Sequence, residues 1–370
     1  MNKDKIKNIV IALTSSVITF GFSILLFTSN TNSNLSKVQE ENKVNNKSFA
    51  IMLQGEDGYV TSDSNSWPTN DYKLNQDLTN CLDSSGAKIE NVLNFDNGQV
   101  SMKANKNLFC YLYFDKINAS EFLLKNSPSG LNSSTAYRGL YRFIGNDTSV
   151  NNYVKLSDNN TEVLYRIIGI TTSTERNTEL GIEANQLKLI KASSLGNYNW
   201  HTSTTDVKWE SSAVYSYLQG SSVLGNENII PTDWLNKISS VKWNIGDVKN
   251  TSPANGNSVV DLEIANITSS SSKVGLMYLS DYYYAYNNGD TNCASSSCLN
   301  WLINTTKGTW TMTRYTSYSI WGIDTDGSID TNWGSTYAAV IRPVIYLTSN
   351  VYISNPNATG SETDPFILSY

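Results

Sequence analysis

An apolar segment near the N-terminus places the strongest constraint on how the rest of the chain can fold. Ile9 to Phe27 is apolar apart from Thr, Ser and Gly, and its length of about 19 residues is close to the roughly 20 that a helix needs to cross a bilayer. Three of the first seven residues are lysines, and positive charge favours the cytoplasmic side. We therefore expect 1–7 to be a cytoplasmic N-terminus and 8–28 a transmembrane anchor. A cleaved signal peptide is the alternative, although no Ala-x-Ala-like site follows the segment.

The next two regions differ sharply in composition. Residues 29–47 are Asn, Ser, Lys and Glu with hardly an apolar side chain, so they cannot bury enough surface to fold and are expected to form a polar stalk. Residues 48–117 contain short alternating runs separated by turn residues, which predicts a small β-domain. In the run FCYLYFD, Cys110 shares one face with Leu112 and Phe114, so it is expected to point into a core.

The four cysteines allow three pairings, and their positions along the chain favour two local ones. These are Cys81 with Cys110 and Cys293 with Cys298. An oxidising compartment outside the membrane would permit both disulfides, and four free buried thiols are the alternative. A metal site at the second pair is disfavoured because His201 is the only histidine and no further cysteine lies nearby.

The overall charge excludes one class of partner. The net charge is -6, and the folded part contains no basic stripe, so the chain is not expected to bind nucleic acid. The 33 acidic residues are spread along the sequence without a motif, and nothing in it points to a carbohydrate hydrolase with paired carboxylates.

Residues 118–136 are expected to be a linker with a short helix, and 137–370 to form the largest domain. The linker contains SEFLLK, with Ser120 as the expected helix cap, followed by Pro and Gly. In the large domain LYRFIG recurs as LYRIIG, which indicates two similar strands that lie close together. Helical spacing follows Ser212, and a second helix is expected from Pro231. The Gly-, Ser- and Asn-rich stretch 244–272 is interpreted as an extended surface excursion.

The aromatic residues are dense between Val274 and Leu347. Here YSIWGIDTDGSIDTNW has an Asp-Gly dipeptide at its centre, which favours a hairpin with a two-residue turn rather than a calcium loop. That register predicts Ile320 opposite Trp333, one face on the core, and Trp321 on a wetter aromatic face. The candidate ligand-binding residues are therefore Tyr315, Tyr318, Trp321 and Trp333, since amphipathic aromatics suit glycan or protein contacts. The alternative is that these aromatics belong mostly to the core.

Arg342 interrupts the apolar run AAVIRPVIYL. A buried arginine needs a carboxylate or several carbonyl groups as partners. Asp281, which follows the predicted strand VGLMYLS, is the candidate partner in a structural ion pair.

The order of several motifs resembles a family of bacterial surface domains. The motifs are YRIIGI, LKLIKAS, VGLMYLSDY, a cysteine followed by NWL, WTMTR and VIRPVIYL, and they extend over 137–370. This family of uncharacterised surface proteins is related to the C-type-lectin-like and formylglycine-generating-enzyme superfamily. The resemblance implies an α+β fold, a C-type-lectin-like mixed domain with two helices on twisted antiparallel sheets, preceded by a small all-β domain. The chain lacks the calcium-binding triplets of sugar-binding lectins, and it lacks the Arg-Gly-Gly-Ser pattern expected around the copper site of the enzymes.

These observations predict a membrane-anchored binding or adhesion protein. It would be held at the bacterial cell membrane by a single N-terminal helix, with the bulk of the chain outside, and would bind a glycan or protein ligand. No catalytic residue, metal ligand or cofactor is predicted. The alternatives are a copper-dependent oxidase that uses Cys293 and Cys298, and a structural spacer without a ligand.

Overall fold

The computed structural model describes most of the chain after residue 46. The described residues are 47–55, 58–63, 67–68, 71–96, 99–102, 107–158, 161–201, 207–246, 255–264, 269–287, 293, 298–303, 306–334 and 336–370. The expected cytoplasmic N-terminus, the expected transmembrane anchor and 29–46 of the expected stalk lie outside them. Among the described residues, no helix is long and apolar enough to span a membrane.

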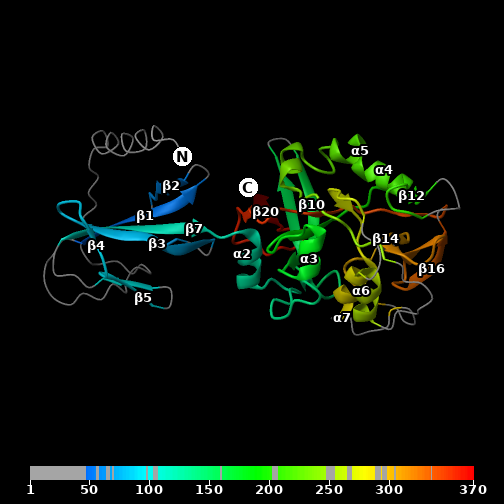
Figure 1. Cartoon of the computed structure of the whole chain (residues 1–370), viewed down its shortest axis with the longest axis horizontal. Helices are drawn as coiled ribbons and strands as arrows, with labels where there is room; N and C mark the ends of the chain where they lie inside the picture. Colours follow the sequence, from blue (N-terminus) through cyan, green and yellow to red (C-terminus); the bar gives the residue numbers. More distant parts are fainter. Residues whose placement is uncertain are drawn as a thin grey trace. The chain divides into compact units, whose positions relative to one another are not determined.

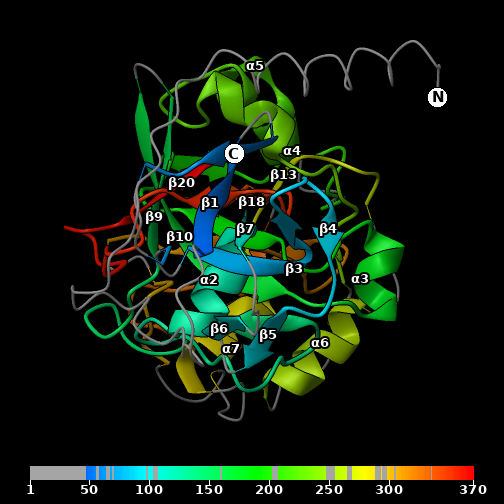
Figure 2. The same cartoon turned by 90° about the vertical axis from the view of Figure 1, so that its left-hand side faces the viewer.

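The chain divides into two compact units, Met1–Asp115 and Lys116–Tyr370. In its described part the first unit is built from strands. Five of them form a sheet in the order β2-β1-β7-β3-β4, while β5 pairs with β6, and Figures 1 and 2 both show β1, β7 and β3 as neighbours. The strands are β1 (Lys47–Gly55), β2 (Gly58–Thr61), β3 (Tyr72–Asp83), β4 (Lys88–Ile89), β5 (Leu93–Asp96), β6 (Gln99–Met102) and β7 (Leu108–Lys116).

Strand β7 alternates between a buried and a more exposed face. Cys110, Leu112 and Phe114 are buried, whereas Phe109 is exposed. Cys110 is bonded to Cys81 of β3, with the two Cα atoms 4.0 Å apart. This confirms the expected disulfide and the expected inward direction of Cys110.

The second unit contains a large sheet in the order β13-β18-β11-β10-β9-β20-β19, with β8 also paired to β10. β10 and β11 are buried along nearly their whole length, because other elements cover both of their faces. β8 and β10 carry the two similar motifs, and Arg142 lies beside Gly169 in their pairing, which confirms that these strands are close. The strands are β8 (Leu140–Arg142), β9 (Tyr153–Ser157), β10 (Glu162–Thr171), β11 (Leu187–Lys191), β13 (Val274–Gly275), β18 (Val344–Tyr346), β19 (Tyr352–Ile353) and β20 (Phe366–Ser369).

A second, five-stranded sheet in this unit has the order β12-β17-β14-β15-β16. Its strands are β12 (Asn197–Asn199), β14 (Thr309–Arg314), β15 (Ser319–Ile323), β16 (Ile329–Gly334) and β17 (Ala338–Val340). One continuous core of buried side chains joins the two sheets and the helices of this unit. The protein is therefore a mixed α+β structure with more sheet than helix, as expected.

The turn of the β15–β16 hairpin is one residue longer than predicted. The Asp324 amide donates to the Ser328 carbonyl (2.8 Å), and the Gly327 amide donates to the Asp324 carbonyl (3.1 Å). Gly327 has a φ of 84°, the left-handed conformation of a type I turn followed by a bulge. A bulge that places an extra residue in β16, between Asp330 and Trp333, offsets the longer turn, so that the distant half of the hairpin keeps the predicted pairing.

Side chains cap two of the helices that the sequence predicted. Asn118 rather than Ser120 caps α2, since its Oδ1 accepts from the Glu121 amide at 2.8 Å. Ser212 caps α4, and the segment after Pro231 forms a short 3₁₀-helix, η1. The helices are α2 (Ala119–Asn126), α3 (Glu175–Leu180), α4 (Ala213–Gln219), α5 (Ser221–Leu224), η1 (Thr232–Lys237), α6 (Gly256–Ile264) and α7 (Leu279–Asn287).

The interpretation of 244–272 as an extended excursion is wrong in its described part. Gly256–Ile264 forms α6, which packs beside α7 (Figure 1). Val259, Val260 and Glu263 are buried on one face of α6, and this face holds the helix against the unit. The polar composition of the flanking residues concealed its short apolar stripe.

Candidate functional site

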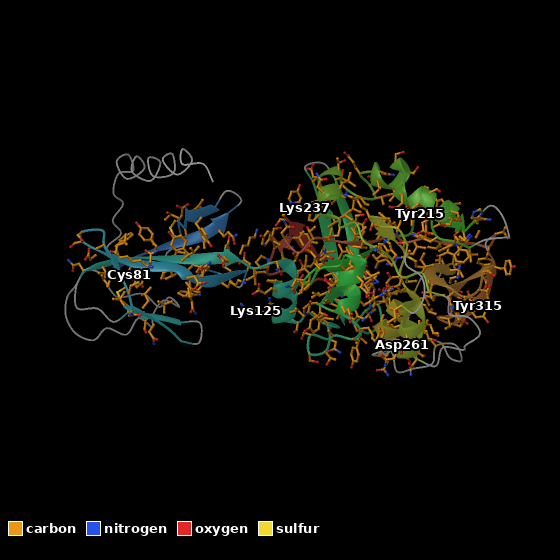
Figure 3. All side chains as sticks on the ribbon, in the orientation of Figure 1. Cys81, Lys125, Tyr215, Lys237, Asp261 and Tyr315 are labelled. Atoms are coloured by element: carbon orange, nitrogen blue, oxygen red, sulfur yellow. A yellow bond between two sulfur atoms is a disulfide. The ribbon has the colours of Figure 1, made fainter. Side chains whose placement is uncertain are left out.

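The predicted aromatic face of the hairpin is only partly exposed. Tyr318 is 62% exposed, and Tyr315, just after β14, is half-buried with its ring edge-on to Trp321 at 4.9 Å (Figure 3). Trp321 itself is only 2% exposed, so its assignment to a wet face is wrong. The reason is that other residues cover both faces of β15 here, since Ile320, Trp321 and Ile323 are all buried.

Trp333 keeps its predicted partner in the backbone pairing, opposite Ile320. Its side chain lies outside what the structure describes, so the prediction that it contacts a ligand stays a prediction. Of the four predicted ligand-binding residues, the structure brings Tyr315 and Trp321 together and leaves Tyr318 on the surface.

A larger group of tyrosines, which the sequence did not predict, lies at the other edge of the same sheet. We define the tyrosine patch as Tyr198 of β12, Tyr217 of α4 and Tyr337, which precedes β17. The rings of Tyr198 and Tyr217 are 4.4 Å apart, and Tyr337 is 47% exposed. The patch combines three separate segments, and no pattern within any one of them signals it.

Buried tryptophans support the tyrosine patch from below. The Trp310 indole donates to the Tyr198 carbonyl at 2.8 Å, and the Tyr337 ring lies edge-on to Trp310 with centroids 6.2 Å apart. Trp200 packs on Trp310 at 5.5 Å. The layer beneath the tyrosine rings is thus fully buried.

The Tyr198 hydroxyl stays protonated at physiological pH. Burial, together with a hydrogen bond to Tyr217, raises the pKa of Tyr198 to about 12. Exposed Asn197 and Asn199 flank Tyr198 on β12. The patch therefore offers aromatic faces beside neutral hydrogen-bonding groups.

The second cysteine pair forms the expected disulfide. Cys293 and Cys298 are bonded, buried and 5.4 Å apart at their Cα atoms. The Cys298 amide donates to the Gly327 carbonyl at 3.3 Å, and the Tyr282 hydroxyl donates to the carbonyls of both Cys298 and Gly327. The disulfide thus anchors its own loop to the turn of the β15–β16 hairpin.

Asp281 does not pair with Arg342, so the predicted ion pair is wrong. Its Oδ2 lies 2.5 Å from Lys188 Nζ and its Oδ1 lies 3.8 Å from an Arg142 nitrogen, and all three side chains are buried. Burial lowers the pKa of Lys188 and of Arg142, and Asp281 opposes this shift in both. Asp281 is thus the carboxylate that two strands of the large sheet share.

Glu263 lies near this ion cluster and is also buried. Its Oε1 accepts hydrogen bonds from the Ser280 amide (3.1 Å) and from the Thr313 hydroxyl (2.6 Å). Burial raises its pKa to about 7, although these hydrogen bonds oppose the shift. Glu263 was not predicted from the sequence, because it lies in the stretch interpreted as a surface excursion.

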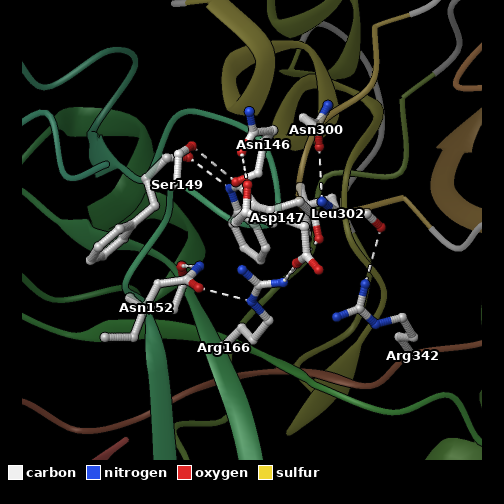
Figure 4. Close-up of polar contacts among 12 residues, drawn as sticks. Asn146, Asp147, Ser149, Asn152, Arg166, Asn300, Leu302 and Arg342 are labelled. Carbon is white, nitrogen blue, oxygen red and sulfur yellow. Dashed lines mark hydrogen bonds and ion pairs between the residues drawn. The ribbon is translucent and has the colours of Figure 1, made fainter. Parts of the chain in front are cut away.

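Arg342 donates hydrogen bonds to backbone carbonyl groups, which are the other type of partner for a buried arginine. Its Nε donates to the Lys191 carbonyl (2.9 Å) and its Nη1 to the Leu302 carbonyl (3.0 Å; Figure 4). Burial, and then the nearby charge of Arg166, lower the pKa of Arg342 to about 10. Arg342 therefore joins the segment between β17 and β18 to β11 and to the loop that follows Cys298.

No protein-family model, curated protein or solved structure matches the chain. Within the described residues, no group of three His, Cys, Asp or Glu side chains is arranged to hold a metal ion. The tyrosine patch, the two surface tyrosines of the hairpin and the buried charges are the features from which a function can be argued.

Proposed function

We propose that the protein is a membrane-anchored, extracytoplasmic binding or adhesion protein that holds a glycan or protein ligand on the tyrosine patch. The observation that carries this proposal is a set of accessible tyrosine rings fixed on fully buried tryptophans. Tyrosine is favoured at binding surfaces because its ring supplies apolar contact area and its hydroxyl supplies a hydrogen bond. Tyr315 and Tyr318 offer a second, smaller contact area on the same sheet.

Two independent features support the location outside the cytoplasm. The apolar segment 8–28 follows lysines, as in a single-pass anchor whose N-terminus stays inside. Each unit also carries a disulfide, and disulfides persist mainly in oxidising compartments.

The fold that we propose for the second unit is C-type-lectin-like. Its support is the order of motifs from YRIIGI to VIRPVIYL together with the mixed sheets and short helices of Lys116–Tyr370. Because the unit lacks the calcium-binding triplets, we expect it to contact its ligand through aromatic rings and not to bind sugar through a calcium ion.

The copper-dependent oxidase receives no support from the geometry. In the disulfide both sulfurs are bonded to each other, and the thiolate is the form that binds a metal. Mass spectrometry of the purified chain under non-reducing conditions, with and without thiol alkylation, shows whether Cys293 and Cys298 form a disulfide or are free thiols. Alkylation of both Cys293 and Cys298 without prior reduction would revive the oxidase.

A binding screen with the full-length chain tests the proposal. A glycan array and immobilised cell-wall material would serve as probes, followed by measurement of Kd for each positive probe. Tyr198→Ala and Tyr337→Ala should each weaken binding about tenfold or more, since aromatic residues at the centre of an interface commonly contribute more than about 1 kcal/mol.

Tyr370→Ala is the matched control. Tyr370 is 42% exposed and lies edge-on to Trp234 at 5.1 Å, so it resembles the patch tyrosines but belongs to a different surface. It should leave Kd unchanged. A chain that captures no glycan or protein would support the spacer instead. A Tyr370→Ala variant that loses binding equally would show that the tyrosine patch is not the specific binding surface.

A further inference from the structure

Three buried cationic side chains gather where β10, β11 and the segment between β17 and β18 meet. They are Arg166, Lys191 and Arg342, each less than a tenth exposed. The charge of Arg166 lowers the pKa of Arg342, and the charge of Arg342 lowers that of Lys191, in each case after burial itself. Like charges at this proximity are unfavourable unless anionic groups compensate them.

Among the described residues, only one carboxylate pairs with any of these three. Asp147 forms an ion pair with Nη1 of Arg166. Lys191 donates to the Ser193 hydroxyl at 2.8 Å, and Arg342 donates to carbonyl groups, which carry no charge. The cluster therefore has more buried positive charge than its own carboxylate offsets.

The guanidinium of Arg166 is held in place for recognition of an anion. Its carbon lies 4.2 Å from the centre of the Tyr153 ring and 4.6 Å from that of Trp301. Its Nε donates to Asn152 at 2.8 Å, while Nη2 is buried and has no hydrogen-bond partner within the described structure. Such an unsatisfied charged donor is costly, and a further acceptor at this group would remove the cost.

Asp147 differs from the three buried cationic side chains because it lies at the surface. Its side chain is 66% exposed, and it lies in the loop after Gly145. Figure 4 shows its carboxylate at the Arg166 guanidinium, on the side toward Arg342. A side chain this exposed can rotate into solvent without breaking any core packing.

We propose that Arg166, with Arg342 and Lys191 behind it, is a binding site for the carboxylate of a small molecule or of a peptide C-terminus. Asp147 occupies the place of that carboxylate in the structure described above. A ligand carboxylate exchanges with Asp147 and adds an acceptor for the second Arg166 nitrogen, in the two-point geometry that guanidinium groups favour. No bond is made or broken, and the site is separate from the tyrosine patch.

Titration calorimetry of the full-length chain with sodium acetate tests this site, with sodium chloride added to keep the ionic strength constant. Asp147→Ala removes the internal competitor and should lower the Kd for acetate at least tenfold relative to the unsubstituted chain. Asp261→Ala is the matched control, because Asp261 also pairs with an arginine, Arg138, but both are exposed. Asp261→Ala should leave acetate binding unchanged.

Further probes identify the group and its source. In Asp147→Ala, N-acetyl-alanine should bind and its amide should not, since they differ only in the carboxylate. A longer N-acetylated peptide acid that binds tighter than acetate indicates a peptide C-terminus, whereas equal Kd values indicate a small carboxylate. Arg166→Lys in the Asp147→Ala background should raise the Kd at least tenfold.

Three outcomes would overturn the site. If Asp147→Ala binds acetate no more tightly than Asp261→Ala does, Asp147 does not compete for the site. Equal binding of the acid and the amide, or of inorganic phosphate and acetate, shows that the carboxylate is not recognised. If Arg166→Lys does not fold, the comparison of acid and amide still decides, because it needs no second substitution.

Discussion

The Nζ atom of Lys188 lies 2.5 Å from Oδ2 of Asp281, and both side chains are almost fully buried. Lys188 belongs to β11 and Asp281 to α7, 93 residues further along the chain. The contact therefore fastens the helix to the middle of the large sheet. Arg142 of β8 approaches the other oxygen of the same carboxylate.

Loss of this carboxylate should destabilise the second unit strongly. Asp281→Ala leaves Lys188 and Arg142 buried without their anionic partner, which should lower the free energy of unfolding by about 3 to 5 kcal/mol. The exposed pair of Arg138 and Asp261 provides the comparison, and Asp261→Ala should cost about 1 kcal/mol or less. Urea unfolding followed by circular dichroism measures both. Similar losses for the two variants would contradict the structural role of Asp281.

The buried carboxyl of Glu263 should make stability fall as pH rises. Its pKa increases from the ordinary value of 4.5 to about 7 on folding, so the folded state binds the proton more tightly than the unfolded state. Its contribution is therefore present below about pH 4.5 and is lost as pH rises through about 7. At about 1.4 kcal/mol per pH unit, the upper bound of this loss is about 3 kcal/mol.

Glu263→Gln isolates this contribution. The amide keeps an oxygen for the Ser280 amide and the Thr313 hydroxyl but cannot ionise. The variant should match the unsubstituted chain near pH 4.5 and exceed its stability at pH 8, as measured by calorimetry across this range. A constant difference between the two chains at every pH would show that Glu263 does not titrate there.

The two disulfides should differ in their effect on stability. The sequence separation is 29 for Cys81–Cys110 and 5 for Cys293–Cys298. On the chain-entropy estimate, the longer loop stabilises by roughly 3 to 4 kcal/mol and the shorter one by about 2 kcal/mol. Hydrogen exchange with mass spectrometry, on double Cys→Ser variants of each pair, reports the two units separately. Loss of protection in the unit that keeps its disulfide would indicate coupling between the units.

Removal of the Arg342 side chain should destabilise the fold without a specific effect on the tyrosine patch. Arg342→Ala leaves the Lys191 and Leu302 carbonyls without their buried donor, which should cost about 1 to 3 kcal/mol for each group. The thermal midpoint should fall, while any ligand of the patch should bind the folded fraction with unchanged Kd. Unchanged stability together with lost binding would assign Arg342 to the ligand site.

Several structural features that depend on residues close together in the sequence were predicted correctly. The cysteine pairs follow from their spacing, and the direction of Cys110 follows from strand alternation. The hairpin was predicted correctly where Ile320 meets Trp333, because that pairing depends on the overall length of the two arms. Its turn was predicted one residue too short, since the compensating bulge in β16 is not visible in the sequence.

Contacts between distant segments could not be predicted in this way. The sequence showed that Arg342 needs a partner, and Asp281 was chosen because it follows the predicted strand VGLMYLS. Lys188 reaches Asp281 only because β11 lies beside the strands that support α7, and this depends on the order of strands in the sheet. The tyrosine patch escaped prediction for the same reason, since its three residues meet only in the folded unit.

The parallel pairing of β1 with β7 determines how the first unit responds to a mechanical load. β1 begins beside the start of β7, so a pull on the N-terminal end of β1 and on the C-terminal end of β7 acts along both strands in opposite directions. The interstrand hydrogen bonds from Lys47–Leu108 to Leu53–Phe114 then share the force at once instead of opening one after another. The Cys81–Cys110 bond joins β7 to β3 and leaves β1 free to slide, so rupture should begin at the β1–β7 seam.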